Sequence, residues 1–229
     1  MIIIFDLDDT LYNERMYVEG GLRSVASFGA ERFGWDREVS FNFMLDILDR
    51  EGRGSIFDKW LAINGRYSKT LVGECVRIYR HHSPQLQLCP EAVELLPLLS
   101  KYPLYLVTDG HKIVQQKKIQ SLNLSPFFRH MFITHCYGIR HAKPSTYCFA
   151  KIREREKCQW HQMVYIGDNP AKDFVNLKPL GVHTVRVLTG VHRKTQAQPD
   201  YEAHQIIENL RYFYPLLKNL EQCHKMPSK

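Results

Sequence analysis

The chain has 229 residues, enough for one full domain and a smaller insert. Hydrophobic residues make up 44% of the chain and charged residues 24%, as in a soluble globular protein, and no apolar run approaches the ~18 residues of a membrane span. The formal net charge of +7 permits nucleic-acid binding, but a basic surface that attracts small phosphorylated substrates explains it equally well.

The chain opens with an apolar segment followed by acidic residues. Ile2–Phe5 predict a short buried strand, and Asp6, Asp8 and Asp9 follow directly. Such carboxylates repel one another and are costly to desolvate unless a cation or hydrogen-bond donors compensate. If the strand continues, Asp6 and Asp8 point to the same side, at the strand end where open α/β sheets bind ligands. The alternative interpretation is an acidic turn in which Asp9 and Thr10 cap the next helix.

Residues 14–84 carry apolar residues at helical spacing and no strand pattern. Turn signals at Gly52-Arg53-Gly54 and Asn64-Gly65 separate the apolar groups, and the segment predicts about four helices. It is long enough to form a small core of its own. We therefore expect a helical domain at 14–84 and an α/β core domain formed by 1–13 and 85–229. The alternative is an ordinary helical excursion packed on the sheet edge.

Strand and helix signals alternate along the rest of the chain. Strands are predicted at 103–108, 130–134, 163–166 and 182–187. Helices are predicted at Glu91–Ser100 and Lys112–Leu122, from Lys143-Pro144 onward, from near Ala171 to Gly181, and at Leu210–Leu220 with a kink at Pro215. The tail Glu221–Lys229 is predicted to fray. The alternation predicts a Rossmann-like α/β fold, a parallel sheet with helices on both faces.

Three further polar segments stand at or near strand ends. They are Thr108-Asp109-Gly110, Lys143-Pro144, and Gly167-Asp168 with Asp173 five residues on. Taken singly, each is more typical of a turn, a helix cap or a solvated lysine. Together with Asp6-x-Asp8-x-Thr10, they resemble in type and order the four motifs of the haloacid dehalogenase-like (HAD) hydrolases. The resemblance covers about residues 1–13 and 85–200, and the insert resembles the helical cap that one subclass carries after motif one.

This resemblance implies a Mg²⁺-dependent phosphatase that cleaves a small phosphate monoester, such as a sugar phosphate or a nucleoside monophosphate. It implies that Asp6 is the nucleophile, which forms an aspartyl-phosphate, and that Asp8 is the acid/base. Asp168 would complete a Mg²⁺ site with a carboxylate oxygen of Asp6 and the backbone carbonyl of Asp8. Asp173 would support Asp168 or a metal-bound water.

The remaining motifs imply phosphate-binding groups. The Thr108 hydroxyl and the Asp109 amide would donate to phosphoryl oxygens, and Lys143 would neutralise charge in the transition state. Position 109 departs from the pattern, because many relatives with this cap carry Asn there. The Asp109 carboxylate would need to point away from the phosphate or contact the cap. Arg15 and Tyr17 follow motif one closely enough to line the site entrance, and we expect them to influence substrate choice.

Other functions remain as alternatives within and outside the family. Asp8 argues against the dehalogenases, which lack a carboxylate there, and Thr10 argues against the sugar phosphomutases, which usually carry Gly-Val after the second Asp. A catalytically weak regulatory or interaction protein with the same fold stays an alternative, although every catalytic position is filled. The sequence leaves the substrate and the oligomeric state open.

Signals for other compartments and partners are absent from the sequence. The N-terminus lacks the pattern of a signal peptide, and we expect a cytoplasmic protein. The six cysteines include no Cys-x-x-Cys pair, which argues against a zinc site and predicts free thiols. Basic residues are spread over the whole chain without a zinc finger, an RNA-binding signature or a long basic run. We therefore expect a small phosphorylated metabolite as partner, and neither a nucleic acid nor a membrane.

Overall fold

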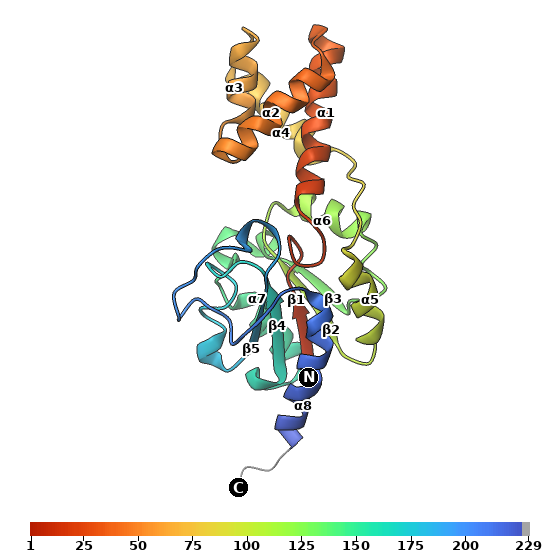
Figure 1. Cartoon of the computed structure of the whole chain (residues 1–229), viewed down its shortest axis with the longest axis vertical. Coiled ribbons are helices and arrows are strands. Elements are labelled where there is room, and N and C mark those ends of the chain that lie inside the picture. Colours follow the sequence, from red (N-terminus) through yellow and green to blue (C-terminus); the bar gives the residue numbers. More distant parts are fainter. Residues whose placement is uncertain (226–229) are drawn as a thin grey trace. The chain divides into compact units, whose positions relative to one another are not determined.

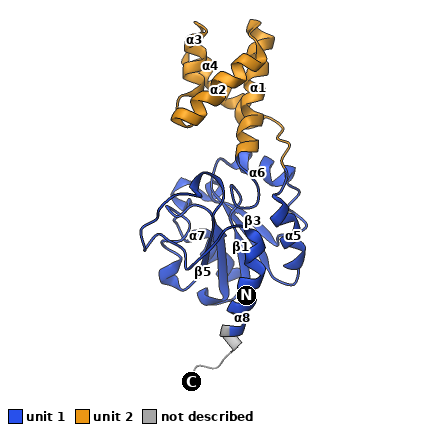
Figure 2. Cartoon of the chain, viewed as in Figure 1, with its two compact units in different colours: residues 1–14, 87–229 blue, residues 15–86 orange. Residues whose placement is uncertain are grey.

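The computed structural model describes residues 1–225 of the chain, and side chains through residue 222 (Figure 1). The chain divides into two compact units (Figure 2). Met1–Glu14 and the chain from Gln87 onward form an α/β unit, and Arg15–Leu86 form a helical unit. Among the described residues, no helix is long and apolar enough to cross a membrane.

A six-stranded parallel sheet forms the centre of the α/β unit. Its strand order is β3-β2-β1-β4-β5-β6. The strands are β1 Ile2–Phe5, β2 Leu104–Thr108, β3 His130–Ile133, β4 Met163–Gly167, β5 His183–Val187 and β6 Gln205–Ile207. All pairings are parallel, which confirms the predicted fold class.

Helices pack on both faces of this sheet (Figure 1). They are α5 Pro90–Leu98, α6 Lys112–Ser121, α7 Tyr147–Glu156 and α8 Phe213–Lys225. Neighbouring residues of β1 point to opposite faces. On one face Ile4 packs in a buried cluster with Phe149 of α7. On the other, the Phe5 ring lies 5.9 Å from the Phe213 ring of α8 and 6.2 Å from that of Phe128.

The prediction that a helix begins at Lys143-Pro144 is wrong. The α7 helix begins at Tyr147, after Thr146 as the N-cap residue. Lys143, ahead of this helix, is bound to other residues of the α/β unit. Its backbone N–H donates to Asp109 Oδ1 at 3.0 Å, and its ammonium lies 2.6 Å from Asp6 Oδ1.

Two further predictions about the later helices are corrected by the structure. Ala171–Leu177 forms turns rather than a helix, and a short 3₁₀ segment, Lys178–Leu180, ends at Gly181 with φ of 90°. Pro215 lies in the first turn of α8, where a missing N–H leaves no helical hydrogen bond unmade, and it does not interrupt the helix. The α8 helix continues through Lys225, so the predicted frayed tail begins as helix, and residues 226–229 lie outside the described part.

The helical unit holds four helices around a core of its own. They are α1 Arg15–Phe33, α2 Arg37–Glu51, α3 Ile56–Ile63 and α4 Lys69–His81. Buried residues from each helix join one cluster, among them Leu22, Met44, Trp60 and Cys75. A Cβ atom added at Gly29 of α1 would lie 2.7 Å from the Trp60 ring, so glycine permits this close packing.

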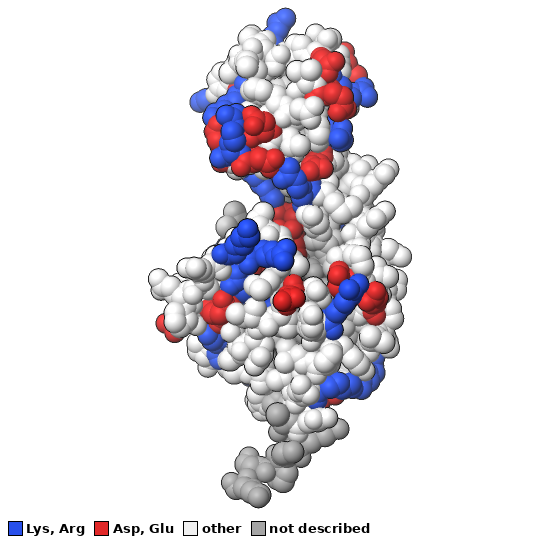
Figure 3. Space-filling view, in the orientation of Figure 1, with Lys and Arg blue, Asp and Glu red and all other residues white. Residues whose placement is uncertain are grey.

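Charged side chains of opposite sign lie next to one another on the face drawn in Figure 3, in both units. In the helical unit Arg15 pairs with Asp49, and in the α/β unit Arg129 pairs with Glu156. Exposed pairs of this kind add little stability, but they spread the charge locally.

Candidate active site

Parallel register gathers the predicted site residues at one edge of the sheet. Phe5 of β1 pairs with Ile166 of β4, so both strands end at the same level. Asp6 directly follows β1, and its backbone N–H donates to the Ile166 carbonyl at 2.8 Å. Thr108 is the last residue of β2, and Asp168 directly follows β4. Residues far apart in sequence therefore meet where the strands end, as is usual for ligand sites in such sheets.

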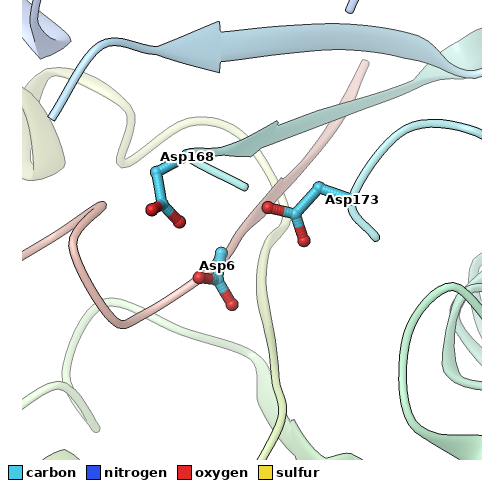
Figure 4. Close-up of side chains that lie close together, drawn as sticks. All are labelled: Asp6, Asp168 and Asp173. Carbon is cyan, nitrogen blue, oxygen red and sulfur yellow. The ribbon is translucent and has the colours of Figure 1, made fainter. Parts of the chain in front are cut away.

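Three buried carboxylates, those of Asp6, Asp168 and Asp173, converge at this edge (Figure 4). Each offers an oxygen atom, and these atoms all lie within 4.8 Å of one another. Burial, together with the neighbouring carboxylates, raises the pKa of Asp6 to about 7 and that of Asp168 to about 9. The cluster is thus short of positive charge, and its hard oxygen donors fit a divalent cation.

Gly167 explains why a glycine precedes Asp168. A Cβ atom added at Gly167 would lie 2.5 Å from Asp173 Oδ2, closer than any real Cβ contact. The same Asp173 oxygen accepts the backbone N–H of Asn169 at 2.9 Å. The Asp173 carboxylate can therefore lie over the strand end only because position 167 has no side chain.

The Lys143 ammonium lies between two of the carboxylates. Its Nζ atom is 2.6 Å from Asp6 Oδ1, 2.7 Å from Asp173 Oδ1 and 2.8 Å from the Tyr165 hydroxyl. Burial opposes a charge on this lysine, but the carboxylates of Asp173 and Asp6 outweigh it and raise the Lys143 pKa above its ordinary value. Lys143 is thus a buried, fixed cation in contact with Asp6.

The Asp109 carboxylate is held within the α/β unit. Its Oδ1 atom accepts the Thr134 hydroxyl at 2.7 Å and the Lys143 backbone N–H at 3.0 Å, and its Oδ2 atom lies 3.4 Å from Lys172 Nζ. Burial alone would raise the Asp109 pKa, but Lys143, Lys172 and these donors lower it. An ionised acid is therefore accommodated at position 109.

The Asp8 side chain faces three donors instead of joining the carboxylate cluster. Its Oδ1 atom accepts the Tyr12 hydroxyl at 2.6 Å and the Lys118 ammonium at 2.7 Å, and its Oδ2 atom accepts the Gln115 amide at 2.8 Å. The Gln115 amide also donates to the Thr108 hydroxyl at 2.6 Å. The acidic motif after β1 is thus tied to the residue that ends β2.

Gln115 and Lys118 were not predicted as site residues, although the sequence carries a signal for them. Both are buried on α6, next to Ile119, and Leu122 follows the helix. Positions 115, 118, 119 and 122 have the i, i+3, i+4, i+7 spacing of a buried helix face. Two polar residues on such a face, directly after a candidate phosphate-binding turn, indicate a function in the site.

The loop after β5 contacts Asp9 through its backbone. The Asp9 carboxylate accepts the N–H groups of Val191 and Glu14, and the Thr189 hydroxyl donates to the Asp9 carbonyl. Gly190 has φ of 58°, and a Cβ atom there would lie 2.1 Å from Asp9 Cγ. Asp9 therefore joins this loop to Glu14, the residue just ahead of α1.

Arg186 of β5 fixes the far part of the same loop and was also missed. Its buried guanidinium donates to Glu202 Oε2 at 2.6 Å and to the carbonyls of His192 and Thr195 at 2.7 and 2.8 Å.

The two residues expected to select substrate lie in the helical unit. Arg15 is exposed, and its guanidinium pairs with Asp49 and Glu19. Tyr17 is only 1% exposed, its ring packs against Tyr79 and His82, and its hydroxyl donates to a backbone carbonyl. We expected Tyr17 to line the site entrance, but its ring is buried against Tyr79 and His82 of its own unit.

Comparison with known proteins matches the chain to one family. A sequence model of the haloacid dehalogenase-like hydrolases matches residues 1–181. The glyceraldehyde 3-phosphate phosphatase of Methanocaldococcus jannaschii is 30% identical, over 96% of this chain and 98% of that protein. The protein of the same name from Pyrococcus furiosus is 27% identical, over 95% and 92%.

Solved structures share the fold. The HAD hydrolase YfnB from Bacillus subtilis, bound to magnesium, has a TM-score of 0.68 at 20% identity and covers 94% of this chain and 97% of its own. A HAD phosphatase from Thermococcus onnurineus has a TM-score of 0.60 at 22% identity, with the same coverage. From the family match and the relative at 30% identity, we conclude that the chain belongs to the haloacid dehalogenase-like hydrolases.

Proposed function

We propose that this protein is a phosphatase that hydrolyses a small phosphate monoester through an aspartyl-phosphate on Asp6. One observation carries the proposal: the buried Asp6 carboxylate lies at a strand end, 2.6 Å from the Lys143 ammonium and beside Asp168. Such a carboxylate can attack phosphorus while the lysine neutralises the transferred group. The shared name of the two archaeal relatives favours a small sugar phosphate, and glyceraldehyde 3-phosphate is the first substrate to test.

Two carboxylates would divide the chemistry. In the first step an Asp6 oxygen bonds to phosphorus, the ester P–O bond breaks, and Asp8 gives its proton to the leaving alcohol. In the second step a water oxygen bonds to phosphorus, Asp8 takes the proton of that water, and the bond between Asp6 and phosphorus breaks to release phosphate. The Thr108 hydroxyl and the Asp109 amide would donate to phosphoryl oxygens.

A Mg²⁺ ion fits the donor set of this site. The carboxylates of Asp6 and Asp168 and the backbone carbonyl of Asp8 would hold it, and Asp173 would support them. The raised pKa values of Asp6 and Asp168 favour this assignment, because they mark a cluster that lacks positive charge. When bound, the cation relieves the repulsion between an attacking carboxylate and an anionic phosphate ester.

We assign substrate selection to the helical unit, which would act as a cap. Its residues 15–86 contribute none of the four motifs. They are inserted between the first strand of the sheet and the strands that follow. An insert with its own core can vary without disturbing the chemistry of the α/β unit. Arg15 stays a candidate for substrate selection, because its side chain is exposed at the start of α1.

The test is phosphate release from a panel of phosphorylated metabolites in the presence of Mg²⁺. The panel contains glyceraldehyde 3-phosphate, larger sugar phosphates and nucleoside monophosphates. We expect turnover of at least one small ester, and Asp6→Asn should reduce it by about 10³-fold or more while the fold stays intact. Near wild-type turnover by Asp6→Asn would contradict the covalent mechanism. A chain that turns over no ester would instead be a regulatory or interaction protein with this fold.

A further inference from the structure

The Asp8 carboxylate is fixed in position by several hydrogen bonds. Three donors of different chemistry, a phenol, an ammonium and an amide, lie within 2.8 Å of its carboxylate. Two of them, Gln115 and Lys118, come from a single helix, α6. The orientation of the Asp8 carboxylate is thus set mainly from the element that follows β2.

Lys118 resembles Lys143 in that its charge lies in the interior. Its side chain is only 3% exposed, and its ammonium lies 2.7 Å from Asp8 and 3.1 Å from Glu14. Lysine is rarely buried without a pairing partner, since desolvating the ammonium is costly. A cation shared by two carboxylates is fixed in position more firmly than one in a single exposed pair, since each contact restricts the same flexible side chain.

We propose that Lys118, assisted by Gln115, is a positioning residue that holds the Asp8 carboxylate in the orientation needed for proton transfer. This inference rests on the proposed function of Asp8 as acid/base. The Lys118 ammonium contacts Asp8 and Glu14, so its effect on catalysis would pass through Asp8. Gln115 adds a link to Thr108, so that the acid/base and a phosphate-binding hydroxyl share one anchor.

The proposal separates two kinds of substrate. An aryl phosphate has a good leaving group and needs little help from an acid, whereas a sugar phosphate has a poor one. With Lys118→Met, formation of the aspartyl-phosphate from p-nitrophenyl phosphate should stay within about threefold of wild type. Its hydrolysis, which needs Asp8 as the base, should slow by about 100-fold. The phosphoenzyme should therefore accumulate from the aryl ester, while the sugar phosphate should show slow formation as well.

The experiment follows acid-quenched phosphoenzyme and released phosphate with both substrates. Lys117→Met is the matched control, because it removes the neighbouring lysine of the same helix, which is only partly buried. It should behave like wild type, and Lys118→Arg, which keeps a cation, should restore part of the rate. With p-nitrophenyl phosphate, kcat and KM should fall together in Lys118→Met while kcat/KM stays within about threefold of wild type, because only hydrolysis of the phosphoenzyme is slowed.

A second variant guards against misfolding. Lys118→Met leaves the carboxylates of Asp8 and Glu14 without their shared cation, which can destabilise the fold. Glu14→Gln combined with Lys118→Met removes the excess negative charge, and it should regain stability but not the hydrolysis rate. Equal losses with both substrates and no accumulated phosphoenzyme would overturn the proposal and assign Lys118 a structural role. A wild-type protein that forms no phosphoenzyme would instead overturn the proposed function, whatever Lys118 does.

Discussion

Lys143 shows how single residues make this site work. Its ammonium neutralises part of a cluster in which Asp6, Asp168 and Asp173 are all buried. Removing one partner of a buried ion pair leaves an uncompensated charge, which is why the lysine and the carboxylates depend on one another. The same lysine also donates its backbone N–H to Asp109, so one residue fixes two motifs.

Gly167 gives a prediction at this scale. Gly167→Ala would place a Cβ atom 2.5 Å from Asp173 Oδ2, so the Asp173 carboxylate must move. Because Asp173 supports the proposed cation site, we expect Mg²⁺ affinity to fall by about 10- to 100-fold, measured by calorimetric titration. Gly73→Ala is the matched control, since a Cβ atom there meets nothing within 4 Å. Unchanged affinity in Gly167→Ala would mean that Asp173 does not influence the cation.

The site residues that could be predicted from the sequence are those that directly follow a predicted strand. Asp6 and Asp168 could be brought together from sequence, because each follows an apolar run that reads as a parallel strand. Gln115 and Lys118 were missed because polar residues on a helix are usually assigned to its exposed face, although their spacing with Ile119 marks a buried face. The partners of Asp109 could not be predicted, because side-chain hydrogen bonds across loops leave no periodic signal.

Elements with a strong hydrophobic pattern were predictable, and those set by site contacts were not. Strands β1, β2 and β4 consist mostly of apolar residues, and β5 alternates polar residues with Val185 and Val187; each of these strands was placed within one residue at either end. Strand β6 has three residues, two of them exposed, so it has no hydrophobic pattern from which it could be predicted. Pro144 is typical of a helix start, yet α7 begins only at Tyr147, and Lys143 just before the proline is bound to Asp109 and Asp6.

The loop after β5 gives a prediction at the scale of elements. In Gly190→Ala the new Cβ atom would lie 2.1 Å from Asp9 Cγ, at a φ of 58° that non-glycine residues rarely adopt. We expect the free energy of unfolding to fall by about 2 to 3 kcal/mol, measured by urea denaturation. Gly65→Ala isolates the backbone cost, because Gly65 has a φ of 64° but meets nothing within 4 Å. If both variants lose the same stability, the contact between the loop and Asp9 contributes nothing.

At the scale of the whole molecule, the catalytic motifs and the helical insert lie in different units. All four motifs lie in the α/β unit, and the helical unit has its own core around Trp60. The helices of that unit could be predicted from apolar spacing, yet the burial of Tyr17 could not. An aromatic residue at a helix start fits either a core or a site entrance, and only the contacts with Tyr79 and His82 decide between them.

The charge balance of the molecule predicts how its stability responds to pH and to Mg²⁺. The pKa values of Asp6 and Asp168 are raised from 3.8 to about 7 and about 9, so between about pH 4 and 9 the metal-free folded state binds more protons than the unfolded state. Their contribution to stability is therefore present at low pH and is lost as the pH rises through these values. A cation needs the ionised carboxylates, so its affinity must change in the opposite direction.

We therefore expect Mg²⁺ to raise Tm more at about pH 8.5 than at about pH 5.5. At a Mg²⁺ concentration 100-fold above the Kd for pH 8.5, the rise in Tm at that pH should be about 5 °C or more. Differential scanning calorimetry with chelator or Mg²⁺ at the two pH values measures this. Asp168→Asn is the control, because it removes a ligand carboxylate, and its Tm should respond weakly to Mg²⁺ at both pH values. An equal Mg²⁺ effect in both proteins would place the cation away from Asp168, and a larger effect at the lower pH would mean that these carboxylates do not bind it.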